Sequence, residues 1–423
     1  MKLTENCNYL LDYFVQNNFI NHVKHSSETN KIFSELYKDI YNSYNTLTDL
    51  KKKDFYKSVV KKINNINEIS KPKLFNANSF PLKIRDHIDN FMLYEITFSF
   101  SLYNRKITVH FVTEDTYPDM KTYEKYLDWI VMWLIILNKY SDKKCSKNLV
   151  IYLYFTSLEK ELPNSNIEIL DQHNINTAFT STCPSNSEII VFRKEEWFKV
   201  FIHETFHNFA LDFSDMNVDE CHKKILSIFK VKSSVNLYES YTEFWGEVIN
   251  ATFCSFLVLK NKNSYKEFLK ILEFILNFEK THSYFQLVKI LNFMGLTYKD
   301  LYDDSEASVS LRNALYKEKT NVLSYFVIKL ILLNNYQEFI EWCSKNNVSL
   351  LHFNKTDKNL MEFCKFIEKN YKSPSLLKGI KNTDYFIKKE FENKNDKNDK
   401  NDKNDKNNVF LLNNLRMSLC EMC

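Results

Sequence analysis

Apolar and polar positions over the first 66 residues follow the spacing of amphipathic helices. Thr4 is a suitable N-cap for the first helix, and similar patterns recur over 32–44 and 55–66. A loop carrying Pro72 and Pro81 follows. The N-terminal region is therefore predicted to be helical. The apolar residues that share one face of its first helix are Leu10, Leu11, Phe14, Phe19 and Ile20.

The pattern changes to strict alternation after residue 90, which is typical of a half-buried β-strand. The alternating apolar residues are Tyr94, Ile96, Phe98, Phe100 and Leu102. A turn at 103–105 and a second alternating segment at 107–111 complete a predicted β-hairpin. The elements predicted after the hairpin are a helix over 118–140 and strands over 149–155, 175–180 and 188–193.

Helical periodicity returns after Arg193 and continues to the end of the apolar pattern. Between Pro184 and Pro374, only two glycines interrupt it. Residues 393–407 repeat the unit Asn-Asp-Lys, which has no apolar side chain to bury and predicts disorder. The short apolar tail that follows could dock back as a helix. The predicted helices run near 194–212, 219–230, 236–260, 264–278, 282–293, 308–317, 321–345 and 358–370.

These patterns predict an α+β fold that is mostly helical, with a small mixed β-sheet between helical N- and C-terminal regions. The predicted units are a helical N-terminal region (1–85), an α/β subdomain (86–212), a helical subdomain (213–385), a disordered linker (386–408) and a C-terminal tail (409–423).

Composition excludes several classes of function. The 423 residues include only three glycines, where average usage of about 7% predicts roughly thirty. A dinucleotide fingerprint, a P-loop and a kinase phosphate loop all need more glycine than this. The net charge is +4, from 57 basic and 53 acidic residues, and no basic stripe stands out. Nucleic acid is therefore not an expected partner.

The N-terminal segment, the length of the apolar runs and the cysteines together predict a cellular location. Polar residues interrupt the N-terminal segment where a signal peptide needs an apolar run. The longest apolar run, Trp129 to Leu137, is much shorter than the ~20 residues that cross a bilayer. The nine cysteines show no regular spacing. We therefore expect no membrane partner, a cytoplasmic location (host cytoplasm or virion if the protein is viral) and reduced thiols.

One motif carries recognisable chemistry. His203, Glu204 and His207 form an HExxH sequence within an apolar helical pattern. Residues four apart leave the same face of a helix, so both imidazoles point the same way, as two ligands of a tetrahedral zinc must. Glu204 lies about 100° further around the helix, where a carboxylate can reach a water molecule without binding the metal. The alternative is a pair of histidines satisfied inside a helical core.

A second helix offers the third ligand. Glu239 and Glu243 are again four residues apart, on a predicted helix with Tyr241, Phe244 and Trp245. Buried carboxylates need positive partners. Glu239 could bind zinc while Glu243 accepts the second N–H of a ligand histidine, or the two could exchange roles. The alternative is a solvated acidic face.

The HExxH sequence and the ExxxE sequence at Glu239 resemble the gluzincins, a group of zinc metallopeptidases. The resemblance covers roughly residues 90–260. It implies a zincin-like sheet, a glutamate as third zinc ligand and an edge strand that lies antiparallel to a bound peptide. Ala178 and Phe179 in the strand over 175–180, or else the strand over 188–192, would supply that edge.

Two features depart from the gluzincin pattern. The gap between His207 and Glu239 is longer than in many members, and Glu243 stands where aspartate is commoner. Both leave the third ligand open between the two glutamates. The metzincins are disfavoured because Phe213 occupies the position of their third ligand. The whole chain, with its repeat and residue bias, also resembles uncharacterised proteins of giant DNA viruses.

The resemblance implies zinc-dependent hydrolysis of peptide bonds, with Glu204 as general base. Tyr325 is the first candidate for the donor that stabilises the oxyanion, with Tyr241 and His282 as alternatives. Two rival hypotheses remain: a non-catalytic zincin-like protein with a structural or virion-assembly role, and a helical interaction protein in which the motif is accidental. The sequence does not decide the substrate, endo- versus exo-cleavage, or the oligomeric state.

Overall fold

The structure is a computed structural model that describes residues 3–20, 22–392 and 410–422. The fold is mixed α+β and mostly helical, as predicted. Its strands are β1 (Tyr56–Lys62), β2 (Tyr94–Leu102), β3 (Arg105–Thr113), β4 (Asn148–Phe155), β5 (Ala178–Thr180) and β6 (Asn186–Val191). The helices of the N-terminal half are α1 (Glu5–Gln16), α2 (Ser27–Lys51), α3 (Leu82–Phe91), α4 (Met120–Tyr140), α5 (Gln172–Ile175) and α6 (Trp197–Asn208).

The C-terminal half of the described chain contains helices and short helical turns. Its helices are α7 (Asp219–Ile228), α8 (Leu237–Val258), α9 (Tyr265–Phe293), α10 (Glu306–Leu315), α11 (Lys329–Asn334), α12 (Tyr336–Asn346), α13 (Asp357–Asn370) and α14 (Pro374–Glu392). Among the described residues, the short helical turns are η1 (Ile66–Glu68), η2 (Lys299–Leu301) and η3 (Leu323–Ile328), the last of which is π-helical.

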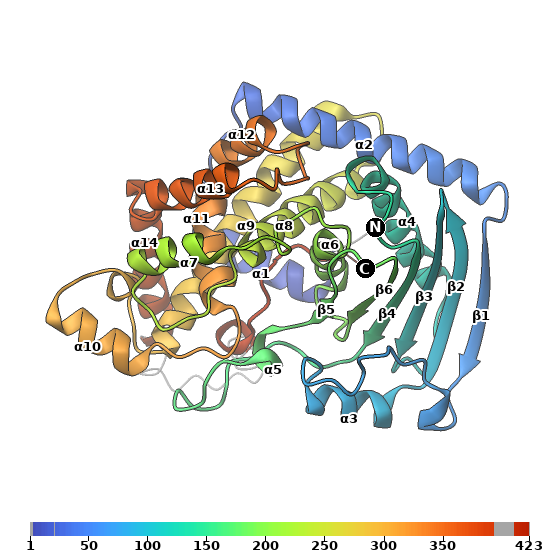
Figure 1. Cartoon of the computed structure of the whole chain (residues 1–423), viewed down its shortest axis with the longest axis horizontal. Coiled ribbons are helices and arrows are strands. Elements are labelled where there is room, and N and C mark those ends of the chain that lie inside the picture. The colour runs from blue at the N-terminus through green and yellow to red at the C-terminus, as the bar shows by residue number, and fades with distance from the viewer. Residues whose placement is uncertain (1–2, 21, 393–409, 423) are drawn as a thin grey trace.

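The six strands form one mixed sheet in the order β1-β2-β3-β4-β6-β5. The antiparallel hairpin predicted for residues 94–111 is present as β2 and β3. Strands β3, β4 and β6 are parallel, and β5 runs antiparallel to β6 at the end of the sheet. Figure 1 shows the sheet on one side of the molecule and most helices on the other, with α6 between them.

Each face of the sheet has its own core because successive side chains of a strand point to opposite faces. On one face, Phe98, Val109 and Ile151 join the large core that continues into the helices. On the other face, a smaller core contains Tyr154 and is closed by α3 and the loop before it through Phe80. The large core positions α6 and α8 against each other.

Several boundaries differ from prediction. The helix expected over 55–66 is instead strand β1, whose residues pair with β2 although most are exposed. The conformation of this segment is determined by pairing along the sheet edge, which the local pattern of apolar residues does not indicate. The helices expected over 264–278 and 282–293 form the single helix α9, and the helix expected over 321–345 is divided into η3, α11 and α12.

The segments around the predicted linker also differ from expectation. Helix α14 continues to Glu392, so residues 386–392 are helical instead of disordered. The Asn-Asp-Lys repeat at 393–407 lies outside the described residues. The tail docks back as expected, but only residues 410–413 are helical and the remainder is extended through the interior.

Four cysteines are paired, although free thiols were expected. The disulfides are Cys145–Cys183 and Cys221–Cys364, with Cα–Cα distances of 4.6 Å and 6.2 Å. The partners are 38 and 143 residues apart, so only the tertiary fold brings them together. Within the described chain, no helix has both the length and the apolar composition needed to cross a membrane.

Candidate metal centre

Helix α6 carries the HExxH sequence through the middle of the molecule. All its residues from Trp197 to Asn208 are buried. Its N-cap, Glu196, has a left-handed backbone (φ 57°), which turns the chain from the end of the sheet into the helix. Helix α8 packs close to α6 at Gly246, where an added Cβ would lie 3.4 Å from His203 Cβ. This packing of α8 on α6 brings the two glutamates of α8 within reach of the histidines.

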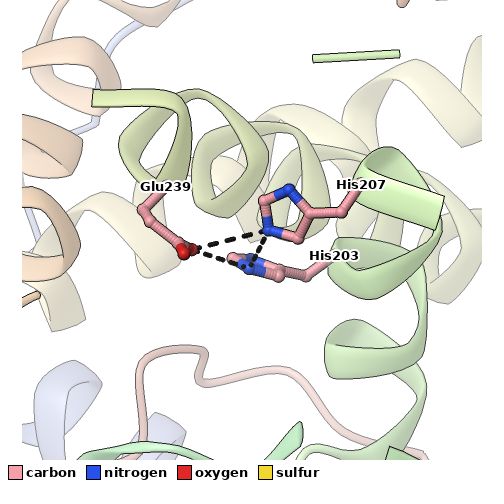
Figure 2. A group of neighbouring side chains, drawn as sticks. All are labelled: His203, His207 and Glu239. Atoms are coloured by element: carbon pink, nitrogen blue, oxygen red, sulfur yellow. Dashed lines mark hydrogen bonds and ion pairs between the residues drawn. The ribbon is translucent and has the colours of Figure 1, made fainter. Parts of the chain in front are cut away.

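Three side chains converge between α6 and α8, as Figure 2 shows. His203 Nε2 lies 3.2 Å from His207 Nε2 and 3.2 Å from Glu239 Oε2. His207 Nε2 lies 3.5 Å from the same oxygen of Glu239. Among the described residues, this is the one group of three His, Cys, Asp or Glu side chains placed to hold a metal ion. The geometry assigns the inward position to Glu239 instead of Glu243.

Each converging side chain is held from behind by a second group. His203 Nδ1 lies 2.9 Å from Glu243 Oε2, and His207 Nδ1 is hydrogen-bonded to Asp212 Oδ2. A carboxylate on Nδ1 keeps a proton on that nitrogen and leaves Nε2 as the ring nitrogen that faces the cluster and can bind a metal. The Tyr325 hydroxyl donates to Glu239 Oε2 at 3.0 Å. All three potential ligands are therefore oriented before any metal binds.

Two of the supporting residues were not assigned such a role from the sequence. Asp212, in the loop after α6, is fully buried against His207. Lys199 lies one helical turn before His203 and forms a buried ion pair with Glu243. Its spacing of four residues from His203 places it on the same helix face, which is the only local signal that could have identified it.

The pKa values reflect a charged, buried cluster. Burial lowers the pKa of His203, but hydrogen bonds to Glu239 and Glu243 outweigh burial and raise it above its ordinary value. Burial is likewise outweighed at His207, whose pKa the charges of Asp212 and Glu239 raise well above normal. Both shifts favour the protonated imidazolium form of the histidines in the metal-free cluster.

We expect zinc binding near neutral pH to release protons from the two histidines. Each Nε2 must lose its proton to bind a metal, while Nδ1 keeps its proton through Glu243 or Asp212. Because both pKa values are raised, the release persists above the ordinary histidine pKa and declines only as the pH rises through the raised values. Calorimetric titration with Zn²⁺ in buffers of different ionisation enthalpy measures the release. Binding without proton release would contradict the protonated cluster.

Glu204 lines a small cavity beside the cluster. Burial raises its pKa to about 7, because the charged form loses hydration. The cavity, of about 30 Å³, is also lined by Ala178, Tyr325, Lys160 and Met417. This space holds about one water molecule but no peptide residue. Glu204 is thus placed beside water-sized space without contacting the cluster through its own carboxylate.

The strand next to this cavity is the edge strand β5. It pairs with β6 on one side and ends the sheet on the other, so the alternative edge over 188–192 is an inner strand. Ala178 lines the Glu204 cavity, but the Phe179 side chain points to the opposite face and packs on Phe80, with ring centroids 5.5 Å apart. Of the two residues predicted to bind substrate, only Ala178 places its side chain at the site.

The other candidates from the sequence lie away from the cluster. The Tyr241 hydroxyl donates to Leu351 O, and His282 lies beside Gln286 within the helical core. Cys183, in the turn before β6, is bonded to Cys145. Cys420 is buried, and its CxxC partner Cys423 lies outside the described residues.

Comparison with known proteins adds no assignment. The chain matches no protein-family model, and no significantly similar curated protein or solved structure was found. Its function must therefore be inferred from its own residues.

Proposed function

We propose that this protein is a zinc-dependent hydrolase of peptide bonds, with His203, His207 and Glu239 as zinc ligands. The observation that carries the proposal is the convergence of these three side chains at mutual distances of 3.2 to 3.5 Å. Ligands in a tetrahedral zinc site lie ~2.0–2.1 Å from the ion, and hence about 3.3 Å from each other. Two imidazoles and one carboxylate leave a fourth position for water or substrate, as catalytic zinc sites require.

Glu204 supports a catalytic instead of a purely structural site. A structural zinc needs no additional carboxylate beside its ligands, whereas hydrolysis needs a base for the attacking water. Bound zinc would supply Lewis-acid polarisation of a carbonyl group and acidify water. Glu204 would take the proton from that water and deliver it to the leaving amine. Its burial in a water-sized space suits both steps, because bulk water competes little for its proton.

A peptide is the substrate class that the surrounding structure favours. Strand β5 ends the sheet beside the Glu204 cavity, so its outer edge is available for pairing with an extended chain. Ala178, the β5 residue in the cavity, has a side chain small enough to let a substrate backbone approach. A peptide added along β5 would carry a carbonyl group toward the metal ligands.

Replacing Tyr325 by Phe should lower the rate of peptide hydrolysis about 10²-fold at saturating zinc. The Tyr325 hydroxyl lies 3.0 Å from Glu239 Oε2 and lines the same cavity as Glu204, where it can donate to a developing oxyanion. Tyr238→Phe, on the His207 side of the cluster, is the matched control. If the Tyr325→Phe variant hydrolyses peptides at the parent rate once zinc is saturating, the role of Tyr325 is limited to holding Glu239.

Metal analysis tests the proposed site directly. We expect about one zinc per chain in protein purified without chelator, and loss of that zinc in the His203→Ala variant. His22→Ala, a substitution of a half-exposed histidine paired with Glu273, should keep its zinc. Folded protein with no zinc, which also fails to bind added Zn²⁺, would overturn the proposal.

A further inference from the structure

The C-terminal segment 410–422, named the tail from here on, crosses the interior of the molecule instead of lying on its surface. Its residues from Asn414 to Cys420 are at most 3% exposed. The tail pairs with the segment after β4, where Leu415 N–H donates to Lys160 O and Leu162 N–H donates to Asn413 O. It ends against the first residues of the chain, where Thr4 N–H donates to Glu421 O.

Buried carboxylates accept the N–H groups of the tail. Glu196 accepts hydrogen bonds from the N–H groups of Met417 and Ser418. Glu279 on α9 accepts from Leu419 N–H at 2.7 Å and from Cys420 N–H at 2.8 Å. In regular structure these N–H groups would bond to neighbouring backbone. Here the side chains of Glu196 and Glu279 accept hydrogen bonds from these N–H groups instead.

The carbonyl groups of the tail are bound in the same way. Gln286 Nε2 donates to Arg416 O at 2.7 Å, and Asn250 Nδ2 donates to Cys420 O at 2.8 Å. Further donors to tail carbonyls are the ammonium groups of Lys289 and Lys329. The body thus forms a groove of buried polar side chains that binds an extended backbone. Recognition of this kind is typical of peptide-binding sites.

The tail joins the body through a purely polar connection. Residues 393–408 consist only of Asn, Asp and Lys, and they follow directly on Glu392 at the end of α14. Such a sequence contributes no apolar surface that would fix the tail in place. The tail is therefore held by its groove contacts and by α1, and not by its attachment to α14.

The tail also contributes to the wall of the cavity beside the candidate metal centre. Met417 lines the cavity that contains Glu204, His203 and Ala178. The cavity volume of about 30 Å³ is far smaller than a peptide residue needs. A peptide that pairs with β5 and reaches Glu204 needs more room than this, and displacement of Met417 would provide it.

We propose that the tail is a tethered peptide ligand, which occupies a groove built for an extended chain and shields the Glu204 side of the metal centre. When the tail leaves the groove, the Glu204 side of the metal centre opens. A peptide with the sequence of the tail can then bind in its place. The binding part of this inference stands on the groove contacts alone, and the shielding part rests on the proposed hydrolase function.

Hydrogen exchange on the intact protein tests whether the tail opens independently of the rest of the molecule. We expect amides 415–420 to exchange about ten-fold faster than those in the middle of α8, although both are equally buried, because the tail opens as an independent unit. Glu279→Gln should accelerate exchange of the tail further, since one amide oxygen replaces the two carboxylate oxygens that bind three tail donors. Glu273→Gln on the same helix, whose carboxylate binds His25 N–H, is the control. Equal protection of tail and α8 in all variants would make the tail an integral part of the core and overturn the proposal.

Peptide exchange in the full chain tests the ligand. A specific protease site is placed between residues 393 and 408, the chain is cut, and a fluorescent peptide of residues 410–423 is added. We expect its anisotropy to rise as it enters the groove, while a scrambled peptide leaves the anisotropy unchanged. Retention of the original tail with no exchange would also overturn the proposal.

Extraction of zinc by a chelator tests the shielding. Cut protein should lose zinc to 1,10-phenanthroline faster than intact protein, and an excess of the tail peptide should restore the slower rate. If cut and intact protein lose zinc at equal rates although the peptide exchanges into the groove, the tail does not shield the metal centre. The binding of the tail in its groove would be unaffected by that result. Absence of zinc would refute the hydrolase function, while the exchange experiment would still decide the binding of the tail.

Discussion

Replacing Glu204 by Gln should abolish most peptide hydrolysis, with a rate lowered by about 10²–10⁴-fold, while zinc remains bound. Glutamine has nearly the same shape but cannot accept the proton of an attacking water. Glu204 is not among the three converging side chains, so its replacement leaves the metal ligands intact. Cleavage of a peptide library followed by mass spectrometry, with zinc content measured on the same samples, gives both quantities.

The control for this prediction separates catalysis from structure. His203→Ala should lose zinc together with activity, whereas Glu204→Gln should lose activity alone. A non-catalytic zinc protein, the main rival hypothesis, predicts no hydrolysis in either the parent chain or the variants. Full activity of the Glu204→Gln variant would remove Glu204 from the mechanism and require another base.

Replacing Lys199 by Met should lower the free energy of unfolding by about 3–5 kcal/mol, because it removes the cation of a buried ion pair and leaves Glu243 with His203 as its remaining hydrogen-bond partner. The Lys199–Glu243 side chains are each only 2% exposed. Burial raises the pKa of Glu243, but the charge of Lys199 and the hydrogen bond to His203 outweigh it, so its pKa lies well below normal. Urea unfolding of the metal-free protein measures the change.

The same substitution should also weaken zinc binding, by about 10- to 100-fold, since Glu243 orients His203. Lys223→Met removes an exposed pair with Glu220 and should change stability by less than about 1 kcal/mol. The double variant Lys199→Met, Glu243→Gln should recover part of the lost stability, because no buried charge is left unpaired. Equal effects of Lys199→Met and Lys223→Met would show that the buried pair contributes nothing specific.

Much of the fold could be predicted because its elements have strong local signals. The alternation in β2 and the long apolar periodicity of α4 and α8 each follow from which face of an element is buried. Strand β1 could not be predicted in this way, since most of its residues are exposed and pairing with β2 determines its conformation. The disulfides Cys145–Cys183 and Cys221–Cys364 could not be predicted either, because nothing in the spacing of these cysteines indicates contact.

By itself, the sequence determined that His203 and His207 share one helix face, that Glu204 lies beside them and that α8 offers two glutamates at the same spacing. These relations are properties of the helix repeat and need no knowledge of the fold. The tertiary structure alone decided which glutamate faces the histidines, because that depends on how α6 and α8 pack at Gly246. It also placed Asp212, Lys199 and the tail around the cluster, since contacts between distant segments depend on the whole core and not on local periodicity.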